Sequence, residues 1–240
     1  MRLCALGDLL LDVVVRTSGS SGPDAEGSAE TRVGAGGQAA NVAAWAAELG
    51  AEARFVGKRG SDAAGELVGH ELSARGVELL GPVEEGRNGV VVSLVAADGN
   101  RTMLTDRGVA PGLRAEELDV RWFSGCDRLQ LSGYSLPSAS GIAEYGPEKL
   151  LSRLELLQPE LVFANEGELA AIGGEVPGTL VLKRGADGFS VDGIDHPALR
   201  ADVVDTTGAG DALAAGYLVS GPELAAQAAA RCVAQLGAMP

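Results

Sequence analysis

The sequence predicts an α/β fold with a mostly parallel β-sheet that is covered by helices on both faces. Short apolar runs typical of buried strands alternate with Ala- and Leu-rich runs typical of helices, and glycine often follows the last residue of a helical run. The segments 12–34 and 90–105 break this alternation, which indicates a small β-layer that projects from the main sheet. The length of 240 residues fits one large α/β unit.

The predicted elements follow from periodicity and from breaker residues. In the first half we expect strands at 3–6, 53–56, 90–96 and 101–105, and helices at 38–49 and 62–74. Asp98-Gly99 between two of these strands is a typical hairpin turn. In the second half we expect strands at 129–131, 161–163 and 179–183, and helices at 147–157, 166–172 and 223–236.

Composition narrows the possible partners. The 33 acidic residues outnumber the 19 basic ones, and the resulting net charge of −14 disfavours binding to nucleic acid or to anionic lipid. No stretch approaches the roughly 18 apolar residues of a membrane span. Cys4, Cys126 and Cys232 are odd in number and far apart, without metal spacing or a disulfide framework. We therefore expect unpaired thiols, a cytoplasmic protein, and neither nucleic acid nor membrane as a partner.

The stretch DTTGAGDALAAGY, from Asp205 to Tyr217, lies where a strand is expected to become a helix. Gly208, Ala209 and Gly210 have little or no side chain, so the free N–H groups of the helix start could surround an anion such as a phosphoryl group. Asp211 could accept the proton of a hydroxyl that attacks this group. The alternative is an ordinary helix start in which glycine makes a tight turn and aspartate is a cap.

A second helix start has the same character. Residues 34–50 read GAGGQAANVAAWAAELG, in which Gly36 and Gly37 would let a ligand lie against the backbone and Asn41 could bind sugar hydroxyls. The alternative is a buried asparagine whose hydrogen bonds are satisfied within the protein. Trp45, one turn later, is more typical of a core position than of a ligand stack.

Together these two stretches resemble the signatures of the pfkB-type carbohydrate kinases, the ribokinase-like family. Further matches cover nearly the whole chain: Gly7-Asp8 with Asp12, GVVVSLVAADGNRT, NEGE, KRGADG and the last Ala-rich helix. The resemblance implies one domain over residues 1–240 with a three-layer α/β/α fold and a lid formed by about 12–34 and 88–107. It also implies ATP-dependent phosphorylation of a hydroxyl on a sugar-like substrate.

The resemblance also implies roles for individual residues. Asp211 would be the catalytic base, with an anion hole formed by Gly208, Ala209 and Gly210, and the sugar would be held by Asp12, Gly36, Gly37 and Asn41. ATP would contact Asn165, Glu168, Lys183, Gly185, Gly188, Ala230 and Val233, with Glu168 acting on Mg²⁺ through water. Asp205 and Thr207 resemble a loop that binds a monovalent cation such as K⁺ in some members. Alternatively, Asn165 and Glu168 are a helix-capping pair and Lys183 is a solvated strand end.

The chain departs from the family in one place. Between Gly133 and Pro147 the family usually has a further helix and strand, but here only YSLPSASGIAEYG is present. Either a βα unit is missing, or residues are omitted near Ser140, within 137–146. A genuine loss would leave a smaller sheet and an incomplete wall on the substrate side.

Several functions stay open on the sequence alone. The leading hypothesis is a kinase for a plain sugar. The alternatives are a kinase for an adenosine-like nucleoside and a kinase for a keto-deoxy sugar acid. Arg101 or Arg107 could bind such an acid, unless the arginine is salt-bridged or solvated. A non-catalytic sugar-sensing module is disfavoured because Asp211 and its glycines are intact. An NAD-type oxidoreductase is disfavoured because the dinucleotide fingerprint is absent. The exposed edges of the lid predict a homodimer that pairs through the lid.

Overall fold

The computed structural model describes residues 1–17, 27–95, 101–135 and 147–240. The predicted turn at Asp98-Gly99 and the whole segment 137–146 lie outside this part of the chain. The α-helices are α1 (Gln38–Glu48), α2 (Ala63–Ala74), α4 (Pro147–Leu157), α5 (Glu166–Ala171), α6 (Ala209–Ser220) and α7 (Pro222–Val233). None of the helices in these ranges combines the length and the apolarity needed to cross a membrane.

The first sheet is fully parallel. Its order is β10-β1-β4-β6, made by β10 (Arg128–Leu131), β1 (Arg2–Leu6), β4 (Glu52–Val56) and β6 (Glu78–Leu80). In β1, Leu3, Cys4 and Ala5 have no exposed surface. Such burial is expected of a central parallel strand with both faces covered. A separate pair of short parallel strands is formed by β5 (Arg59–Gly60) and β7 (Val83–Glu84).

The second sheet is mixed and has the order β11-β12-β13-β14. It is made by β11 (Leu161–Asn165), β12 (Thr179–Lys183), β13 (Phe189–Val191) and β14 (Ile194–His196), of which only β11 and β12 pair in parallel. The hairpin of β13 and β14 was not predicted. Its turn, Asp192-Gly193, has positive φ angles of 46° and 84°, which is the geometry that favours an Asp-Gly pair.

Among the described residues, no strand joins the two sheets. β10 pairs only with β1, and β11 pairs only with β12. The segment between Gly133 and Pro147, where the sequence predicts either a missing βα unit or omitted residues, lies between these two strands along the chain, and residues 136–146 of it lie outside the described part of the chain. The mostly parallel α/β architecture is confirmed, but its parallel strands are divided between two sheets.

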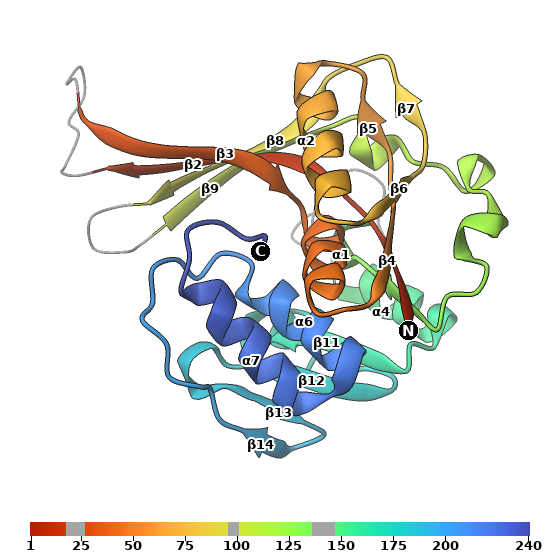
Figure 1. Ribbon diagram of the computed structural model, residues 1–240. Helices are drawn as coiled ribbons and strands as arrows, with labels where there is room; N and C mark the ends of the chain where they lie inside the picture. Colours follow the sequence, from red (N-terminus) through yellow and green to blue (C-terminus); the bar gives the residue numbers. More distant parts are fainter. Residues whose placement is uncertain (18–26, 96–100, 136–146) are drawn as a thin grey trace.

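A third sheet forms the projecting β-layer (Figure 1), with the order β3-β2-β8-β9. Its strands are β2 (Leu10–Thr17), β3 (Ala29–Gly36), β8 (Asn88–Val95) and β9 (Arg101–Gly108). Asp12, Val14, Val91 and Ser93 share one face by register, and the last three are buried. The strands agree with the expected ranges 12–34 and 88–107, whereas the function of this sheet as a lid stays a prediction.

Helix α6 contributes to two hydrophobic clusters. Ala212 and Ala215 pack in the cluster that contains β1 and α1, whereas Leu213 packs with Val181 and Phe189 of the second sheet. In α1, Trp45 is 1% exposed and its Nε1 donates to the carbonyl of Ala238 at 2.8 Å. The interpretation of Trp45 as a core residue therefore holds.

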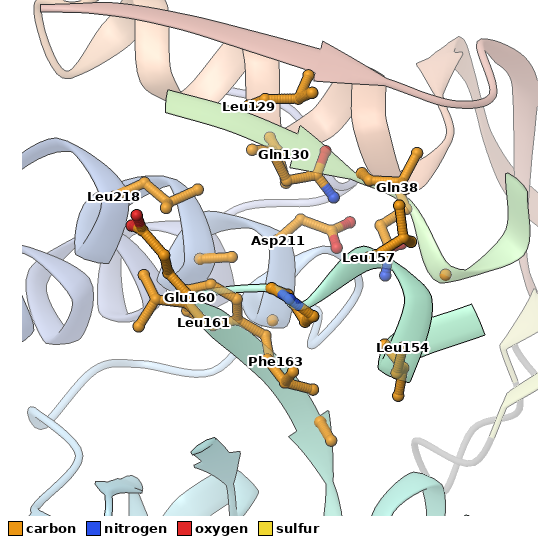
Figure 2. A pocket seen from close by; sticks show the side chains of 18 of the residues that line it. Gln38, Leu129, Gln130, Leu154, Leu157, Glu160, Leu161, Phe163, Asp211 and Leu218 are labelled. Carbon is orange, nitrogen blue, oxygen red and sulfur yellow. The ribbon is translucent and has the colours of Figure 1, made fainter. Parts of the chain in front are cut away.

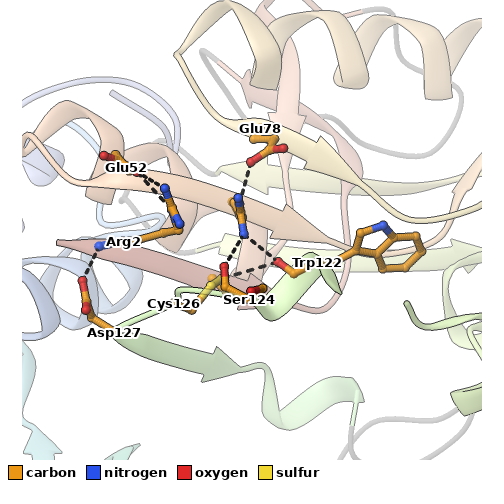
Figure 3. A network of polar contacts seen from close by, with 9 residues as sticks. Arg2, Glu52, Glu78, Trp122, Ser124, Cys126 and Asp127 are labelled. Atoms are coloured by element: carbon orange, nitrogen blue, oxygen red, sulfur yellow. Dashed lines mark hydrogen bonds and ion pairs between the residues drawn. A yellow bond between two sulfur atoms is a disulfide. The ribbon is translucent and has the colours of Figure 1, made fainter. Parts of the chain in front are cut away.

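The expectation of unpaired cysteines is wrong for two of the three. Cys4 of β1 and Cys126, which precedes β10, form a disulfide with a Cα–Cα distance of 6.1 Å (Figure 3). The two strands are parallel neighbours although the cysteines are 122 residues apart, and sequence spacing cannot reveal such a meeting. Because disulfides persist mainly in oxidising compartments, this pair removes the cysteine argument for a cytoplasmic location, which stays a prediction.

Ion pairs surround the disulfide on the surface of the first sheet (Figure 3). Arg2 pairs with Glu52 at 2.6 Å, and Arg54 pairs with Glu78 at 2.5 Å and donates to the carbonyl of Ser124 at 3.0 Å. The bond from Arg54 to Ser124 ties the segment before β10 to β4, and the backbone N–H of Arg2 ties it to β1 by donating to Oδ2 of Asp127 at 2.7 Å. Exposed ion pairs of this kind contribute little each, and the disulfide adds a covalent link.

Candidate active site

Helix α6 presents Asp211 in its first turn. Gly208 is the N-cap with φ 77°, and a Cβ built on it would lie 2.6 Å from Ala238, so the turn requires glycine. The N–H of Ala209 has only a long contact of 3.4 Å with the carbonyl of Thr206. This helix start can therefore offer N–H groups and a positive dipole end to an anion.

Asn41 connects the two glycine-rich helix starts. Its Nδ2 donates to Oδ2 of Asp211 at 2.8 Å, across 170 residues of sequence. Its Oδ1 is buried and has no hydrogen-bond partner in the described ranges. The amide thus holds one carboxylate oxygen of Asp211 and keeps an acceptor for a ligand hydroxyl.

The pKa of Asp211 reflects these surroundings. Burial raises it from 3.8 to about 6, against the hydrogen bond from Asn41 and the charge of Lys183, which lower it, and Glu168 raises it further. A carboxylate with this pKa is ionised at neutral pH and can still bind a proton during a reaction, as a general base must.

Asp12 lies against the glycines that open α1. A Cβ built on Gly36 would lie 2.1 Å from the Asp12 carboxyl carbon, and one built on Gly37 would lie 2.4 Å from the carbonyl oxygen of Asp8. Burial and the charges of Asp211 and Asp205 raise the pKa of Asp12 to about 7. The structure thus brings Asp12, Gly36, Gly37 and Asn41 near Asp211.

Lys183 ends β12 beside the start of α6. Its Nζ would lie 3.3 Å from a Cβ built on Gly210, and it pairs with Oε2 of Glu168 at 3.7 Å. Asn165 and Glu168 form a reciprocal capping box with both bonds at 2.8 Å. The capping alternative is therefore realised, and Lys183 is a mostly buried ammonium rather than a solvated strand end.

The remaining predicted contacts lie apart from this group. Gly185, Gly188, Ala230 and Val233 are not among the residues that line the cavity beside Asp211. Gly188 has φ 89°, and its built Cβ would lie 2.1 Å from the carbonyl of His196, so local packing already requires glycine there. Contacts of these four residues with a nucleotide stay a prediction.

Asp205 and Thr207 form a closed loop. Oδ1 of Asp205 accepts from the N–H of Thr207 at 2.9 Å and from its hydroxyl at 2.7 Å, and Oδ2 accepts from the N–H of Gly237 at 3.0 Å. Through these hydrogen bonds Asp205 and Thr207 stabilise the turn before α6. Binding of a monovalent cation there stays a prediction.

A buried ion pair of Arg107 with Asp8 adds to the site, and from the sequence Asp8 had no role beyond its place in the Gly7-Asp8 match. Nη2 of Arg107 lies 2.6 Å from Oδ2 of Asp8 and donates to the carbonyl of Tyr134 at 3.0 Å, while its Nη1 is buried without a partner in the described part of the chain. Arg107 is thus salt-bridged, as one interpretation had it. Asp8 follows the first strand, and that position at the carboxyl end of a parallel strand was the available signal.

A cavity of about 390 Å³ opens beside Asp211 (Figure 2). Gly210, Lys183, Glu168 and Tyr134 line it with Asp211, together with residues of α1, α4, α6, β10 and β11. Tyr134 and Gln130 were not singled out by the sequence. A carboxylate, an ammonium and a helix start therefore meet at one end of an otherwise largely apolar cavity.

A carboxylate, an ammonium and a helix start beside parallel strands suit phosphoryl transfer in an α/β protein. The chain belongs to the pfkB family of carbohydrate kinases, whose sequence model matches residues 1–145. It is an ATP-dependent carbohydrate kinase with a ribokinase-like fold.

Individual relatives agree with this placement. The chain is 32% identical to an ATP-dependent ribose-1-phosphate kinase of Halopiger xanaduensis, over 92% of this chain and 84% of that protein. In structure it is similar to adenosine kinase of Sinorhizobium meliloti, with a TM-score of 0.80, 22% identity, and coverage of 100% of this chain and 95% of the other. A sugar kinase of Pyrococcus horikoshii in complex with ATP gives a TM-score of 0.81 at 23% identity, over 99% and 95% of the two chains.

Proposed function

We propose that this kinase transfers the γ-phosphoryl group of ATP to a hydroxyl of a pentose that carries an anionic group, with ribose 1-phosphate as the first candidate. The observation that carries the proposal is the carboxylate of Asp211, which is bonded to Asn41 and lies between the start of α6 and Lys183. Base, acceptor-binding amide and cationic groups thus lie within one site.

The proposed reaction is an in-line displacement. The acceptor oxygen forms a bond to the γ-phosphorus, the bond from this phosphorus to the β,γ-bridging oxygen breaks, and ADP leaves. The carboxylate of Asp211 takes the proton of the acceptor hydroxyl. The N–H groups at Gly208, Ala209 and Gly210 and the ammonium of Lys183 stabilise the charge on the transferred group.

Arg107 is salt-bridged to Asp8, so only its Nη1, which has no partner among the described residues, remains to favour an anionic acceptor. Its guanidinium is fixed by Asp8 and Tyr134, and Nη1 is left as a buried donor. Phosphate and carboxylate groups are the acceptors that match a guanidinium best. The name of the Halopiger relative points to the same class, a sugar that already carries a phosphate. This class differs from the plain sugar favoured by the sequence.

The proposal includes further components. Glu168 fits a role near Mg²⁺ because one carboxylate with phosphates and waters suffices for this ion, and the described residues hold no cluster of three metal-ligating side chains. When bound, Mg²⁺ would neutralise charge on the phosphates. A K⁺ ion at Asp205 and Thr207, a homodimer through the β2-β3-β8-β9 sheet and a cytoplasmic location belong to the proposal as well.

The acceptor can be tested with a panel. Formation of ADP and of the phosphorylated product would be measured with Mg-ATP and ribose 1-phosphate, ribose, a keto-deoxy sugar acid or adenosine. We expect the highest kcat/KM for ribose 1-phosphate. Arg107→Met should raise KM for ribose 1-phosphate more than KM for ribose. A higher kcat/KM for ribose or adenosine would refute the anionic acceptor and leave the kinase assignment intact.

The base can be tested independently of the acceptor. Asp211→Asn is expected to lower kcat by about 10²- to 10⁴-fold, because the proton of the acceptor then has no base to accept it. ATP affinity should stay near that of the unmodified protein. Asp202→Asn, an exposed aspartate nearby, is the matched control. Turnover of the Asp211 variant at the rate of the control would refute the assignment of the base.

A further inference from the structure

The glycine-rich segment that leads into α1 is held from outside the site by Glu71 of α2. This helix packs beside the end of β3 (Figure 1), and Oε2 of Glu71 accepts a hydrogen bond from the N–H of Ala35 at 2.9 Å. Because β3 lies at the edge of the described sheet, alternate N–H groups of its backbone face away from β2 and need another partner. A carboxylate is a stronger acceptor than a neutral oxygen, so this bond fixes the end of the strand.

The residues after Ala35 cannot move independently of Asp12. A Cβ built on Gly36 would lie 2.1 Å from the carboxyl carbon of Asp12, so the backbone and this carboxyl group are in direct contact. In the first turn of α1, the N–H of Asn41 donates to the carbonyl of Gly37 at 2.8 Å. A displacement of Ala35 would therefore shift the backbone against Asp12 and tilt the helix start that carries Asn41.

Arg75, one turn further along α2, holds the carboxylate of Glu71 in place. Nη1 of Arg75 lies 3.6 Å from Oε2 of Glu71 and donates to the backbone carbonyl of Glu71 at 2.9 Å. Nε of Arg75 donates to the carbonyl of Pro240 at 3.1 Å, which anchors the guanidinium. A glutamate whose side chain is 27% exposed would otherwise lose conformational freedom to make its bond. The arginine thus keeps the carboxylate directed at β3.

Glu71 and Arg75 lie apart from the reacting groups. The described residues that line the cavity beside Asp211 include neither of them. Glu71 can therefore act on the reaction only through the backbone that it holds. Such an effect is large enough to measure, because a misplacement of about 1 Å caused by a distant substitution can lower a rate by about 100-fold.

We propose that Glu71 is a positioning residue for the acceptor. By holding the N–H of Ala35 it sets the place of Gly36 against Asp12, and so the shape of the site that receives the hydroxyl groups of the acceptor. The inference rests on the proposed function, because it assumes that Asp12 and Gly36 bind the acceptor. The effect of Glu71 falls on the KM of the acceptor and leaves the KM of ATP unchanged.

The test measures both KM values in variants of Glu71, with the acceptor of the panel that gives the highest kcat/KM. Glu71→Leu removes the bond to Ala35 and is expected to raise KM for the acceptor about 10-fold. Glu71→Gln keeps the length of the side chain and an acceptor oxygen, so its KM should stay near the original value. Glu71→Asp keeps the charge but is too short to reach Ala35 and should raise KM. Glu66→Leu, at an exposed glutamate of the same helix, is the matched control.

The outcomes separate this inference from the proposed function. A KM for the acceptor that rises more in Glu71→Leu and Glu71→Asp than in Glu71→Gln and Glu66→Leu supports it. An unchanged KM in all four variants overturns it and leaves the kinase function standing, and so does a fall in kcat alone, which would reflect a loss of folded protein.

Two further outcomes are decisive. A rise in Glu71→Gln that equals or exceeds the rise in Glu71→Asp overturns the inference, because the charge of the side chain would then matter more than its reach. If Glu71→Leu does not fold, this comparison of Glu71→Gln with Glu71→Asp decides alone. Absence of phosphotransfer from ATP to every acceptor of the panel overturns the proposed function, and the inference with it.

Discussion

At the scale of single residues, four effects that partly oppose one another set the pKa of Asp211. Burial raises its pKa most, the hydrogen bond from Asn41 and the charge of Lys183 lower it, and Glu168 raises it. If burial acted alone, the pKa of Asp211 would be higher, and a smaller fraction of the carboxyl would be ionised at neutral pH and able to accept a proton. The contacts with Asn41 and Lys183 thus keep a buried acid in its basic form.

The pH dependence of turnover follows from this pKa. Because the pKa of Asp211 is raised to about 6, the base is ionised above this pH and protonated below it. We expect kcat to be constant near neutral pH and to fall by about tenfold per pH unit below about pH 6. The measurement is kcat against pH with saturating acceptor and ATP. A kcat that does not change down to about pH 5 would contradict the prediction.

At the scale of elements, the β2-β3-β8-β9 sheet has two unlike faces. Its inner face carries Asp12 and the buried Val14 and Val91, whereas Val33, Leu94 and Leu104 lie on the outer face by register and are exposed. The edge strands, β3 and β9, each pair on one side only in the described sheets. An apolar face with free edges favours association with another copy.

A homodimer is therefore expected at micromolar concentration. Leu104→Glu should shift the protein toward the monomer, because it places a charge on the exposed apolar face, in the edge strand β9. Molar mass from light scattering during gel filtration measures this shift. Leu156→Glu, on the exposed side of α4, is the control and should leave the mass unchanged. A monomeric unmodified protein would refute the dimer.

Particular elements show how far the sequence could lead. The helix Pro147–Leu157 and the strand Thr179–Lys183 were predicted with their observed bounds, because proline and glycine mark their ends. The last helix was predicted to reach Leu236 but ends at Val233, since an Ala-rich run gives no stop signal before Gly237. The hairpin at Asp192-Gly193 was missed although its turn carried a recognisable pair.

Some residues of the candidate site could be predicted from the sequence, and others could not. Asp211 and Asn41 could be singled out because glycine-rich helix starts mark them locally, whereas Lys183 and Glu168 came from the resemblance to the family's motifs. The buried pair of Asp8 with Arg107 and the cavity along β10 could not, because they depend on which distant segments become neighbours. Pairings of that kind are set by tertiary packing, which local patterns do not encode.

At the scale of the whole molecule, the disulfide joins positions that are 122 residues apart. A loop of this length gives a stabilisation of about 4–5 kcal/mol in the chain-entropy model, within a usual range of about 2–5 kcal/mol. We expect Cys126→Ser to lower the free energy of unfolding by about 2–5 kcal/mol, measured by denaturant titration. A reducing agent should destabilise the unmodified protein and have no effect on the variant. Equal stability of both proteins would contradict the role of the disulfide.

The position of α6 has a consequence for how the enzyme fails under stress. This helix carries Asp211 and also packs into two hydrophobic clusters, the one with β1 and α1 and the one with Val181 and Phe189. A slight loosening between the two sheets would misalign Asp211 and Lys183 before either sheet lost its hydrogen bonds. Inactivation by warming or by mild denaturant should therefore precede any loss of the circular dichroism signal. The enzyme should lose activity at a lower temperature than the midpoint of its thermal unfolding.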